Sequence, residues 1–494
     1  MNPAGWSARG QLLLAFLAGA ASVLAFAPFG LAPLAVLSLA LLFYLWRHPA
    51  RAGLNTWTGY AFGLGLMGFG VFWIRISIAQ FGGVPPAMAV VITLLFALLM
   101  ALFFALAGWL GERLRRDSEM IWLLLVLPAV WVLVEWLRGW LLTGFPWLSL
   151  GYSQIDLPLA GFGLVAGVYG IGLVLAVSAV LLNLWPRPSA VLALLLLWGA
   201  GLGMQQLSWT EPAGAPFRAS LLQANIPQEQ KWLRAMRAPT LKLYLEMTAS
   251  VPDSRLVVWP ETAVPAFADE VESSLLDPLH RALSEQGRDL LLGVVDGERD
   301  GAYFNAMLSL GASGRDRYHK RHLVPFGEYL PMDRWTRPVL DFLRIPMSDF
   351  TPGGNGRPLV ALAGHAAGVN ICYEDAYASE VIRALPEAAF LINASNDAWF
   401  GDSLAPHQHL EIARMRALEA GRYLLRATNT GISAIIDEHG TLRGTAPQFE
   451  KAVLTYEVQP LAGATPFARW GNTAVVLLAA LMLLIGAARQ RPGG

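Results

Sequence analysis

The chain has 494 residues, enough for two or three domains, and its formal net charge of zero gives no indication of a nucleic acid partner. Hydrophobic residues make up 55% of the chain and charged residues only 15%, a composition that excludes an ordinary soluble enzyme. The single cysteine excludes an internal disulfide.

The charged side chains are unevenly distributed along the chain. Residues 1–210 carry 14 of the 72 charged side chains, and none of these is lysine. Residues 461–494 carry three more, and the remaining 55 fall within 211–460. This pattern indicates lipid around the two flanks and water around the middle.

Eight apolar stretches approach the length of about 20 residues that a transmembrane helix needs. The first resembles a signal peptide, but no cleavage site with a polar segment behind it follows, and a second apolar run begins almost at once. We therefore expect an uncleaved helix there. The predicted helices are 11–27, 31–46, 56–78, 86–110, 120–138, 160–185, 189–207 and 471–488.

The arginines near the helix ends predict the orientation, because cytoplasmic loops carry an excess of basic residues. With a cytoplasmic N-terminus, nine arginines lie inside, and only Arg75 and Arg138 lie in short outside loops. We expect both termini in the cytoplasm and the polar region outside it. The inside set is Arg9, Arg47, Arg51, Arg113, Arg115, Arg116, Arg187, Arg489 and Arg491.

The polar region reads as an α/β domain. Runs of apolar, β-forming residues alternate with helical stretches such as "PTLKLYLEMTASV", which favours a sheet covered by helices. The predicted organisation is a bundle of about seven helices in 1–210, an outer domain in 216–460, and a last helix with a tail in 468–494. Strands are expected at 217–226, 254–261, 289–295, 365–374, 388–396 and 432–437.

Three segments of this domain end in a reactive side chain. "VVWPET" presents Glu261, "YHKRHLVPFGEY" presents Lys320 and Glu328, and "NICYED" presents Cys372. A thiol is mostly protonated at neutral pH, so a nucleophilic cysteine needs a base, and acyl transfer also needs a donor for the developing oxyanion. Glu261 as base, Cys372 as nucleophile and Lys320 as oxyanion stabiliser would meet these needs.

Each residue also has a purely structural interpretation. A cysteine flanked by apolar residues is commonly an inert buried thiol, and Glu261 could be a surface carboxylate or a helix cap. Lys320 lies in the basic run "RDRYHKRH", which is typical of a solvated face, and Glu328 could cap a turn or pair with that run. His319 and His322 could bind a metal, but no second cluster supports this.

Longer motifs favour the catalytic interpretation. "WPETAVP", "YHKRHLVPFGEYLP" and "NICYED" resemble, in the same order, the Glu, Lys and Cys motifs of the nitrilase superfamily. The helical frame and the stretches "TGFPWL" (143–148), 221–232 and 393–437 are similar to those of its membrane-embedded members, the apolipoprotein N-acyltransferases. The resemblance implies an α-β-β-α sandwich for the outer domain.

The resemblance also implies roles for individual residues. It makes Glu261 the general base, Lys320 the stabiliser of the tetrahedral intermediate and Cys372 the acylated nucleophile, with no cofactor and no metal. The implied supporting or substrate-binding residues are Glu328, Glu374, Tyr373, Trp232 and Asn225, of which Tyr373 and Trp232 match aromatic residues at or near the substrate entrance.

The implied reaction is a two-step acyl transfer at the bacterial inner membrane, with the outer domain in the periplasm. Cys372 takes an acyl chain from a phospholipid, with phosphatidylethanolamine as the expected donor, and forms a thioester. The free α-amine of a diacylglyceryl-modified apolipoprotein then takes the acyl chain. We expect the protein to act as a monomer.

Features around the site have two interpretations each. The aromatic stretches 399–406 and 329–347 could exclude water from the thioester or simply pack the domain against the bilayer. Among the intramembrane charges Arg75, Glu135 and Arg138, Glu135 and Arg138 have the helical spacing of a pair, although a phosphate headgroup is the other possible partner.

Two rival functions remain compatible with the motifs. A membrane-tethered amidase of nitrilase type would pass its acyl group to water. A non-catalytic lipid-binding protein on an inactive nitrilase domain would not need the complete Glu, Lys and Cys set. A transporter is disfavoured because the helices show no paired repeats.

Overall fold

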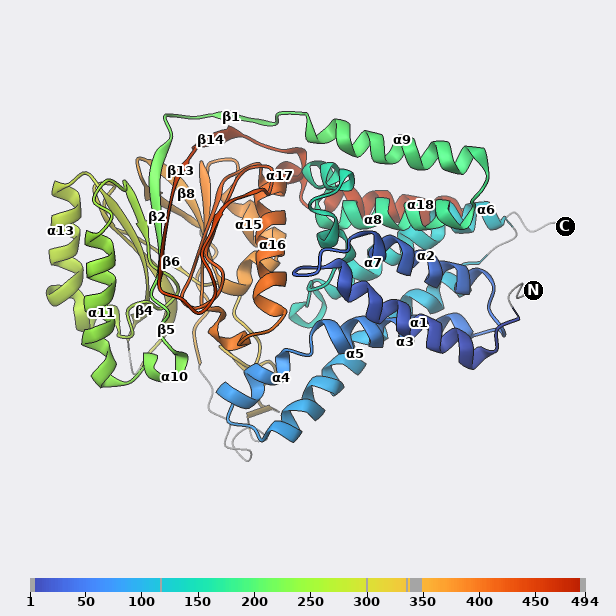
Figure 1. The fold of residues 1–494 in the computed structure, drawn as a ribbon, viewed down its shortest axis with the longest axis horizontal. Coiled ribbons are helices and arrows are strands. Elements are labelled where there is room, and N and C mark those ends of the chain that lie inside the picture. Colours follow the sequence, from blue (N-terminus) through green and yellow to red (C-terminus); the bar gives the residue numbers. More distant parts are fainter. Residues whose placement is uncertain (1–4, 116–117, 299–300, 335, 338–348, 489–494) are drawn as a thin grey trace. The chain divides into compact units, whose positions relative to one another are not determined.

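The computed structural model describes residues 5–115, 118–298, 301–334, 336–337 and 349–488. The chain divides into two compact units, shown as a ribbon in Figure 1. The first is helical and comprises Met1–Arg75, Pro85–Leu207 and Trp470–Gly494. The second comprises Ile76–Val84 and Ser208–Arg469. A short piece of the apolar N-terminal region thus belongs to the α/β unit, which the sequence did not indicate.

Long apolar helices form the first unit. Five are long and apolar enough to cross a membrane, and a sixth qualifies if α3 and the segment Ile74–Phe81, bent by 53°, form one span. The helices are α1 (Ala8–Ser22), α2 (Pro33–Arg47), α3 (Leu54–Gly70), α5 (Pro86–Arg113), α6 (Glu119–Ile121), α7 (Leu127–Arg138), α8 (Gly163–Asn183), α9 (Pro188–Gln205) and α18 (Thr473–Ala488).

The expected count of eight spans is not confirmed by helix length. The two remaining apolar helices, Pro33–Arg47 and Thr473–Ala487, have fewer than 18 residues. At a rise of about 1.5 Å per residue, a 15-residue helix reaches only about 22 Å, short of a hydrocarbon core of about 30 Å. Composition predicted both helices correctly, to within two residues at each end that the structure describes.

Close helix contacts hold the first unit together at small residues. A Cβ on Gly19 of α1 would lie 1.9 Å from the carbonyl oxygen of Phe62 on α3, and one on Gly108 of α5 would lie 2.1 Å from that of Asn55. Only glycine lets these backbones approach so closely, which is the usual way for helices to associate in lipid. Exposed leucines on α9 and α18, such as Leu195 and Leu484, face away from the bundle.

The intramembrane charges Glu135 and Arg138 hold a loop. Arg138 donates to the carbonyl oxygens of Phe145 and Trp147, both at 2.6 Å, and Oε1 of Glu135 accepts from the N–H of Leu150 at 3.0 Å. Both side chains are buried. The loop carbonyls lie in an apolar setting, so a buried guanidinium supplies the donors that they need. Arg75 is exposed and lies over the ring of Phe72.

Two six-stranded sheets form the second unit. Each has parallel central strands, with register pairs such as Leu221 with Val258 and Asn370 with Asn393. The first sheet has the order β13 (Ala452–Val458), β2 (Phe217–Gln223), β3 (Leu256–Val258), β4 (Asp289–Gly297), β5 (Tyr303–Gly311), β6 (Asp316–His319). The second has the order β12 (Leu442–Thr445), β11 (Ala434–Ile436), β10 (Leu424–Thr428), β9 (Phe390–Ser395), β8 (His365–Ile371), β7 (Leu359–Leu362). Strands β1 (Thr210–Pro212) and β14 (Leu461–Gly463) form a separate antiparallel pair.

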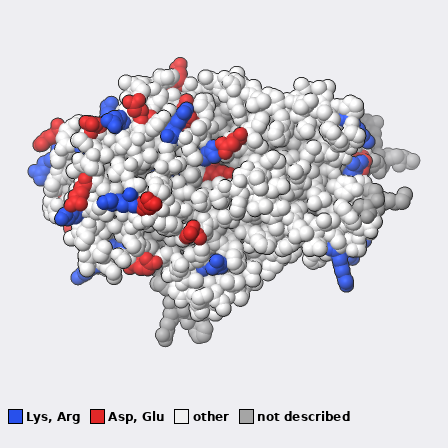
Figure 2. Space-filling view, viewed as in Figure 1, with Lys and Arg blue, Asp and Glu red and all other residues white. Residues whose placement is uncertain are grey.

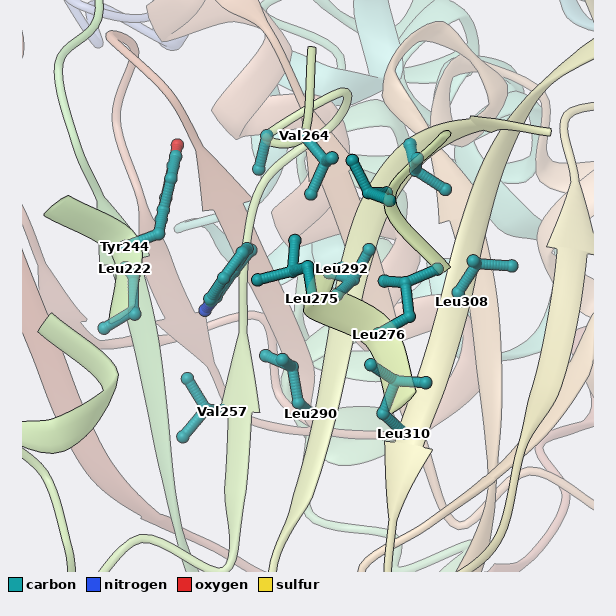
Figure 3. Packing of buried hydrophobic residues seen from close by; sticks show 14 of the residues in the cluster. Leu222, Tyr244, Val257, Val264, Leu275, Leu276, Leu290, Leu292, Leu308 and Leu310 are labelled. Atoms are coloured by element: carbon teal, nitrogen blue, oxygen red, sulfur yellow. The ribbon is translucent and has the colours of Figure 1, made fainter. Parts of the chain in front are cut away.

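Helices cover the outer face of each sheet, and the inner faces pack together. Figure 3 shows Tyr244 of α11 (Arg234–Ala249) beside Leu222, and Leu276 beside Leu308 and Leu310 of the first sheet. Helices α11 and α13 (Asp277–Glu285) cover that sheet, while α15 (Ala378–Val381) and α16 (Ala405–Ala420) cover the second. Between the sheets, the rings of Phe217 and Phe390 lie 5.2 Å apart. The second unit is thus the expected α-β-β-α sandwich.

The charged side chains are distributed differently over the two units. Figure 2 shows charged side chains crowded over the α/β unit, while most of the visible surface of the helical unit carries none. At the end of the helical unit where both termini lie, basic residues reappear. There, Arg47 pairs with Glu119 at 3.0 Å, and Arg115 donates to the carbonyl of Arg47.

Candidate active site

Glu261 follows the buried strand β3 and has one free carboxylate oxygen. The preceding Trp259 anchors the loop, because its ring stacks on Tyr244 at 4.8 Å. Oε1 of Glu261 accepts from Nδ2 of Asn305 at 2.7 Å and lies 3.6 Å from Nζ of Lys320. Oε2 is buried and has no hydrogen-bond partner among the residues that the structure describes. One oxygen is therefore held in place, and the other is available to accept a proton.

Lys320 directly follows β6 and has a side chain only 1% exposed. Its backbone N–H donates to the carbonyl of Asn305 at 2.8 Å, and its ammonium lies 2.8 Å from Oε1 of Glu328. Burial acts to lower the pKa of Lys320, but the negative charges of Glu328 and Glu261 outweigh it and raise the pKa above its ordinary value. The side chain is therefore a fixed cation inside the site.

Glu328 is the second carboxylate at this lysine. Its Oε1 also accepts from Asn305 at 3.1 Å, and its Oε2 accepts from the backbone N–H of Val324 at 2.8 Å. Both oxygens are thus occupied, in contrast to those of Glu261. Glu328 fixes the ammonium of Lys320 and is itself held by hydrogen bonds to both of its oxygens.

Asn305 joins the two carboxylates, and sequence reasoning missed it. It lies on β5 and its Nδ2 donates to both Glu261 and Glu328. A buried amide on a strand is costly unless it is hydrogen-bonded, so "YFNAML" contains a weak signal in its single polar residue. The sequence alone does not show which residues accept hydrogen bonds from this amide.

Cys372 stands at the end of β8 in a strained conformation. Its φ of +51° lies in the left-handed region, where a side chain with a Cβ is disfavoured by roughly 1–2 kcal/mol. The side chain is 7% exposed, and the carbonyl accepts from Nδ2 of Asn393 at 3.0 Å. Burial raises the pKa of the thiol, and the charge of Glu261 adds to this while Lys320 opposes it. Burial thus favours the neutral thiol, which needs a base to react.

Glu374 ties the cysteine turn to the lysine segment. It accepts from the N–H groups of Ile371 at 2.7 Å and Arg321 at 2.8 Å, and from the hydroxyl of Tyr318 at 2.8 Å. Burial raises the pKa of Glu374 to about 7, although these backbone donors favour its charged form. The residue therefore positions Cys372 and Lys320 through their neighbouring backbone.

A buried charge network lies behind Cys372, and sequence reasoning also missed it. His409 on α16 contacts Oδ1 of Asp375 at 2.8 Å and Oδ1 of Asp397 at 3.0 Å. Arg426 on β10 contacts Oδ2 of Asp397 at 2.8 Å and Oδ1 of Asn393 at 2.6 Å. Since Asn393 in turn donates to the carbonyl of Cys372, the network stabilises the strained backbone at Cys372.

The remaining predicted site residues lie in different settings. Tyr373 is buried and its hydroxyl accepts from Tyr377 at 2.9 Å. Trp232 is 53% exposed, at the end of α10 (Gln228–Lys231). Asn225 has a φ of +55° and donates its amide to the carbonyl of Phe449 at 2.6 Å. This bond anchors the loop in which Asn225 lies.

The two histidines of the basic run have separate partners. His319 contacts Asp296 at 2.6 Å, and His322 stacks on Tyr377 with ring centroids 3.7 Å apart. Among the described residues no group of three or more His, Cys, Asp or Glu side chains is placed to hold a metal ion. Residues 335 and 338–347 of the aromatic stretch 329–347, like Arg489 and Arg491, lie outside the described residues.

Comparisons with known proteins cover nearly the whole chain. Residues 18–181 match the family model of the apolipoprotein N-acyltransferase N-terminal domain, and residues 218–467 match that of the carbon-nitrogen hydrolases. An apolipoprotein N-acyltransferase of Methylococcus capsulatus is 48% identical, covering 97% of this chain and 96% of that protein. One of Nitrosomonas europaea is 46% identical, covering 96% and 97%. A solved structure from Saccharomyces cerevisiae, a member of branch 10 of the nitrilase superfamily, is 17% identical, with a TM-score of 0.37, and covers 51% of this chain and 93% of that one.

Proposed function

The chain belongs to the apolipoprotein N-acyltransferase family, and we propose that Cys372, Glu261 and Lys320 carry out its acyl transfer. It is an acyltransferase with a carbon-nitrogen hydrolase domain and the apolar helices of a bacterial membrane protein. The observation that carries the proposed mechanism is that the two carboxylate oxygens of Glu261 have different surroundings. Its Oε1 is held by Asn305, and its Oε2 is buried without a partner among the described residues.

The first step forms the thioester. Glu261 takes the thiol proton of Cys372 as Sγ attacks the ester carbonyl carbon of a phospholipid, with phosphatidylethanolamine as the proposed donor. The carbonyl oxygen becomes an oxyanion that the ammonium of Lys320 stabilises. When the ester C–O bond breaks, Glu261 returns the proton to the departing alkoxide, and a lysophospholipid leaves.

The second step transfers the acyl chain to the lipoprotein. The free α-amine of the diacylglyceryl cysteine attacks the thioester carbonyl, and Glu261 accepts a proton from the nitrogen. The C–S bond then breaks, an amide forms, and the proton returns to Sγ of Cys372. Lys320 stabilises the oxyanion again, so the same three groups serve both steps. Glu328 and Glu374 position Lys320 and Cys372, while Tyr373 and Trp232 contribute aromatic surface to the substrate side.

We place the protein in the bacterial inner membrane, with eight spans, both termini cytoplasmic and the α/β unit periplasmic. Basic residues at the end of the helical unit that carries both termini support this orientation. A site beside the bilayer lets both lipid substrates keep their chains in the membrane. Exposing those chains to water would cost about 0.8 kcal/mol per methylene. A reporter fused to the C-terminus that is active only in the cytoplasm tests this topology.

Mass spectrometry of the full-length protein tests the mechanism. Incubation with phosphatidylethanolamine vesicles and no acceptor is expected to give a hydroxylamine-sensitive acyl adduct on the peptide that contains Cys372. A diacylglyceryl peptide with a free amine should then discharge it. Cys372→Ala should form no adduct, and Glu261→Gln should form it roughly 10²–10⁴-fold more slowly. Glu246→Gln, an exposed carboxylate on α11, is the matched control.

The outcomes separate the proposal from its rival. A wild-type protein that leaves the lipid intact and Cys372 unmodified contradicts the proposed mechanism. Release of free fatty acid at the same rate with and without the amine acceptor would identify water as the acceptor, as in a membrane-tethered amidase. Vesicles of other headgroup composition, tested in parallel, decide whether phosphatidylethanolamine is the preferred donor.

A further inference from the structure

A second buried lysine lies at the catalytic carboxylate. The chain has only four lysines, at positions 231, 242, 320 and 451. Lys242 and Lys451 are exposed, whereas Lys231 and Lys320 are 3% and 1% exposed. Lysine is almost never fully buried without a specific partner, so two buried lysines at one site call for a physical reason.

The contacts of Lys231 centre on the turn that carries Glu261. Its Nζ donates to the backbone carbonyl of Glu261 at 3.1 Å and to Oγ1 of Thr262 at 2.9 Å. Lys231 comes from the last position of α10, 30 residues before Glu261 in the sequence. It therefore contacts the backbone of the carboxylate residue, while Lys320 contacts its side chain.

The turn that Lys231 holds is strained and tightly packed. Thr262 has a φ of +47°, in the left-handed region that a β-branched residue rarely adopts. A Cβ on Gly293 of β4 would lie 2.3 Å from the backbone nitrogen of Thr262, so β4 packs directly against the backbone of the turn. A conformation of this kind persists only when surrounding contacts enforce it, and the two bonds from Lys231 are such contacts.

Lys231 also balances the charge of the site. The two carboxylates of Glu261 and Glu328 face the ammonium of Lys320, which leaves one negative charge uncompensated when Cys372 is a neutral thiol. A second ammonium brings the sum over Glu261, Glu328, Lys320 and Lys231 to zero. The charged or titratable groups that act on Lys231 are Glu261, from the loop after β3, and Cys372, from the end of β8. Burial lowers the pKa of Lys231 to about 8, and these two groups oppose the shift.

We propose that Lys231 is a positioning residue for acyl transfer, whose ammonium fixes the Glu261–Thr262 turn and supplies the second positive charge beside the base. The inference rests on the proposed role of Glu261 as the general base. It extends the functional set beyond Glu261, Lys320 and Cys372 to a residue that acts through the backbone and charge of Glu261.

The test measures the rate of thioester formation on Cys372 against pH, in full-length protein with phosphatidylethanolamine vesicles and no acceptor. Lys231→Met keeps the length of the side chain and removes its charge, and Lys231→Arg keeps the charge. Lys242→Met, which changes an exposed lysine of α11, is the matched control. Thermal melting of each variant accompanies the rates.

The expected result has two parts. Lys231→Met forms the thioester about tenfold or more slowly than wild type at pH 7, and Lys242→Met does not. The wild-type rate falls above about pH 8 as Lys231 loses its proton, while Lys231→Arg, which stays charged, keeps its rate to higher pH. If Lys231 had a purely structural role, its replacement by arginine would not change the pH above which the rate falls.

Three outcomes would overturn the inference. In the first, the wild-type rate of thioester formation does not fall between pH 8 and 10. In the second, Lys231→Met folds and has the wild-type rate. In the third, the rate of Lys231→Arg falls at the same alkaline pH as that of wild type. The first needs no variant and so does not depend on folding. Failure of the proposed function looks different, because wild type itself would then form no adduct on Cys372, or its rate would be insensitive to Glu261→Gln.

Discussion

The amide of Asn305 donates to Oε1 of Glu261 at 2.7 Å, across 44 positions of sequence. This bond holds Oε1, while Oε2 has no hydrogen-bond partner in the described part of the chain, and we propose that Oε2 accepts the proton of the thiol. The same amide reaches Glu328 at 3.1 Å, so one side chain sets the spacing of both carboxylates around Lys320.

Replacing Asn305 by Leu, a residue of similar size, should slow thioester formation roughly 10–100-fold. The loss of a buried hydrogen bond to a charged group is worth about 1.5–3 kcal/mol, and each 1.4 kcal/mol is tenfold in rate. The rate of adduct formation on Cys372 checks this. Ser309→Ala, on the same strand, is the control. An unchanged rate in a folded Asn305→Leu protein would show that Glu261 does not need this bond.

Lys320 and Glu328 should behave as one unit in a double-mutant cycle. Glu328→Gln leaves the buried ammonium without its 2.8 Å partner, and Lys320→Met leaves the carboxylate uncompensated, so each single change should destabilise the protein by about 3–5 kcal/mol. The double variant should lose much less than the sum, because each change removes the charged group that the other change leaves without its 2.8 Å partner. Thermal melting of the four proteins measures the coupling. Strict additivity would contradict the close pairing.

His409 should stabilise the fold at low pH. The carboxylates of Asp375 and Asp397 raise the pKa of His409, against the lowering by burial and by Arg426. A base with a raised pKa contributes stability that is fully present below its unfolded value of about 6.5 and is lost as pH rises through the folded value. The deficit of His409→Gln against wild type should therefore be largest below about pH 6.5 and shrink above it.

His407, on the same helix α16, provides the opposite control. Burial lowers the pKa of His407, and Asp402 opposes the shift, so its protonation penalises the folded state at low pH. His407→Gln should therefore gain stability relative to wild type as the pH falls. Melting temperatures of both variants between pH 5 and 8 test the pair. The same pH trend in both would contradict the assignment of His409 to the buried network.

Lys231→Met should stabilise the protein while it impairs the reaction. The pKa of Lys231 is lowered from 10.5 to about 8, so the buried ammonium penalises folding at pH values below 8, by up to about 3 kcal/mol. The lost bonds to the Glu261 turn offset part of this gain. The stability advantage of the variant should narrow as pH rises from 8 to 10.5, which thermal melting measures. A variant less stable than wild type across this range would show that the bonds from Lys231 to the Glu261 turn outweigh the cost of burying its ammonium.

Much of the site could be predicted from local sequence, because three of its reactive side chains come just after strands. Glu261, Lys320 and Cys372 each come just after a run with the pattern of a buried strand, and the structure brings Glu261 and Lys320 within 3.6 Å. Most strand ranges were predicted too long, as in 254–261 against Leu256–Val258, because pairing ends where the chain turns toward the site, whereas 289–295 was too short against Asp289–Gly297. Asn225, which the resemblance groups with the supporting residues, donates its amide to the carbonyl of Phe449, and its role in the site stays a prediction.

The sequence by itself determined which parts of the chain prefer lipid and which residue types supply a thiol, a base and a cation, since length, hydropathy and chemistry are local properties. Only the tertiary structure decided that Asn305 and Lys231 meet Glu261, and that His409 and Arg426 lie behind Cys372. These side chains are far apart in the chain, and their direction and burial depend on how two sheets and their helices pack. Packing leaves Oε2 of Glu261 without a partner among the described residues, and this is the oxygen through which we propose that Glu261 acts as the base.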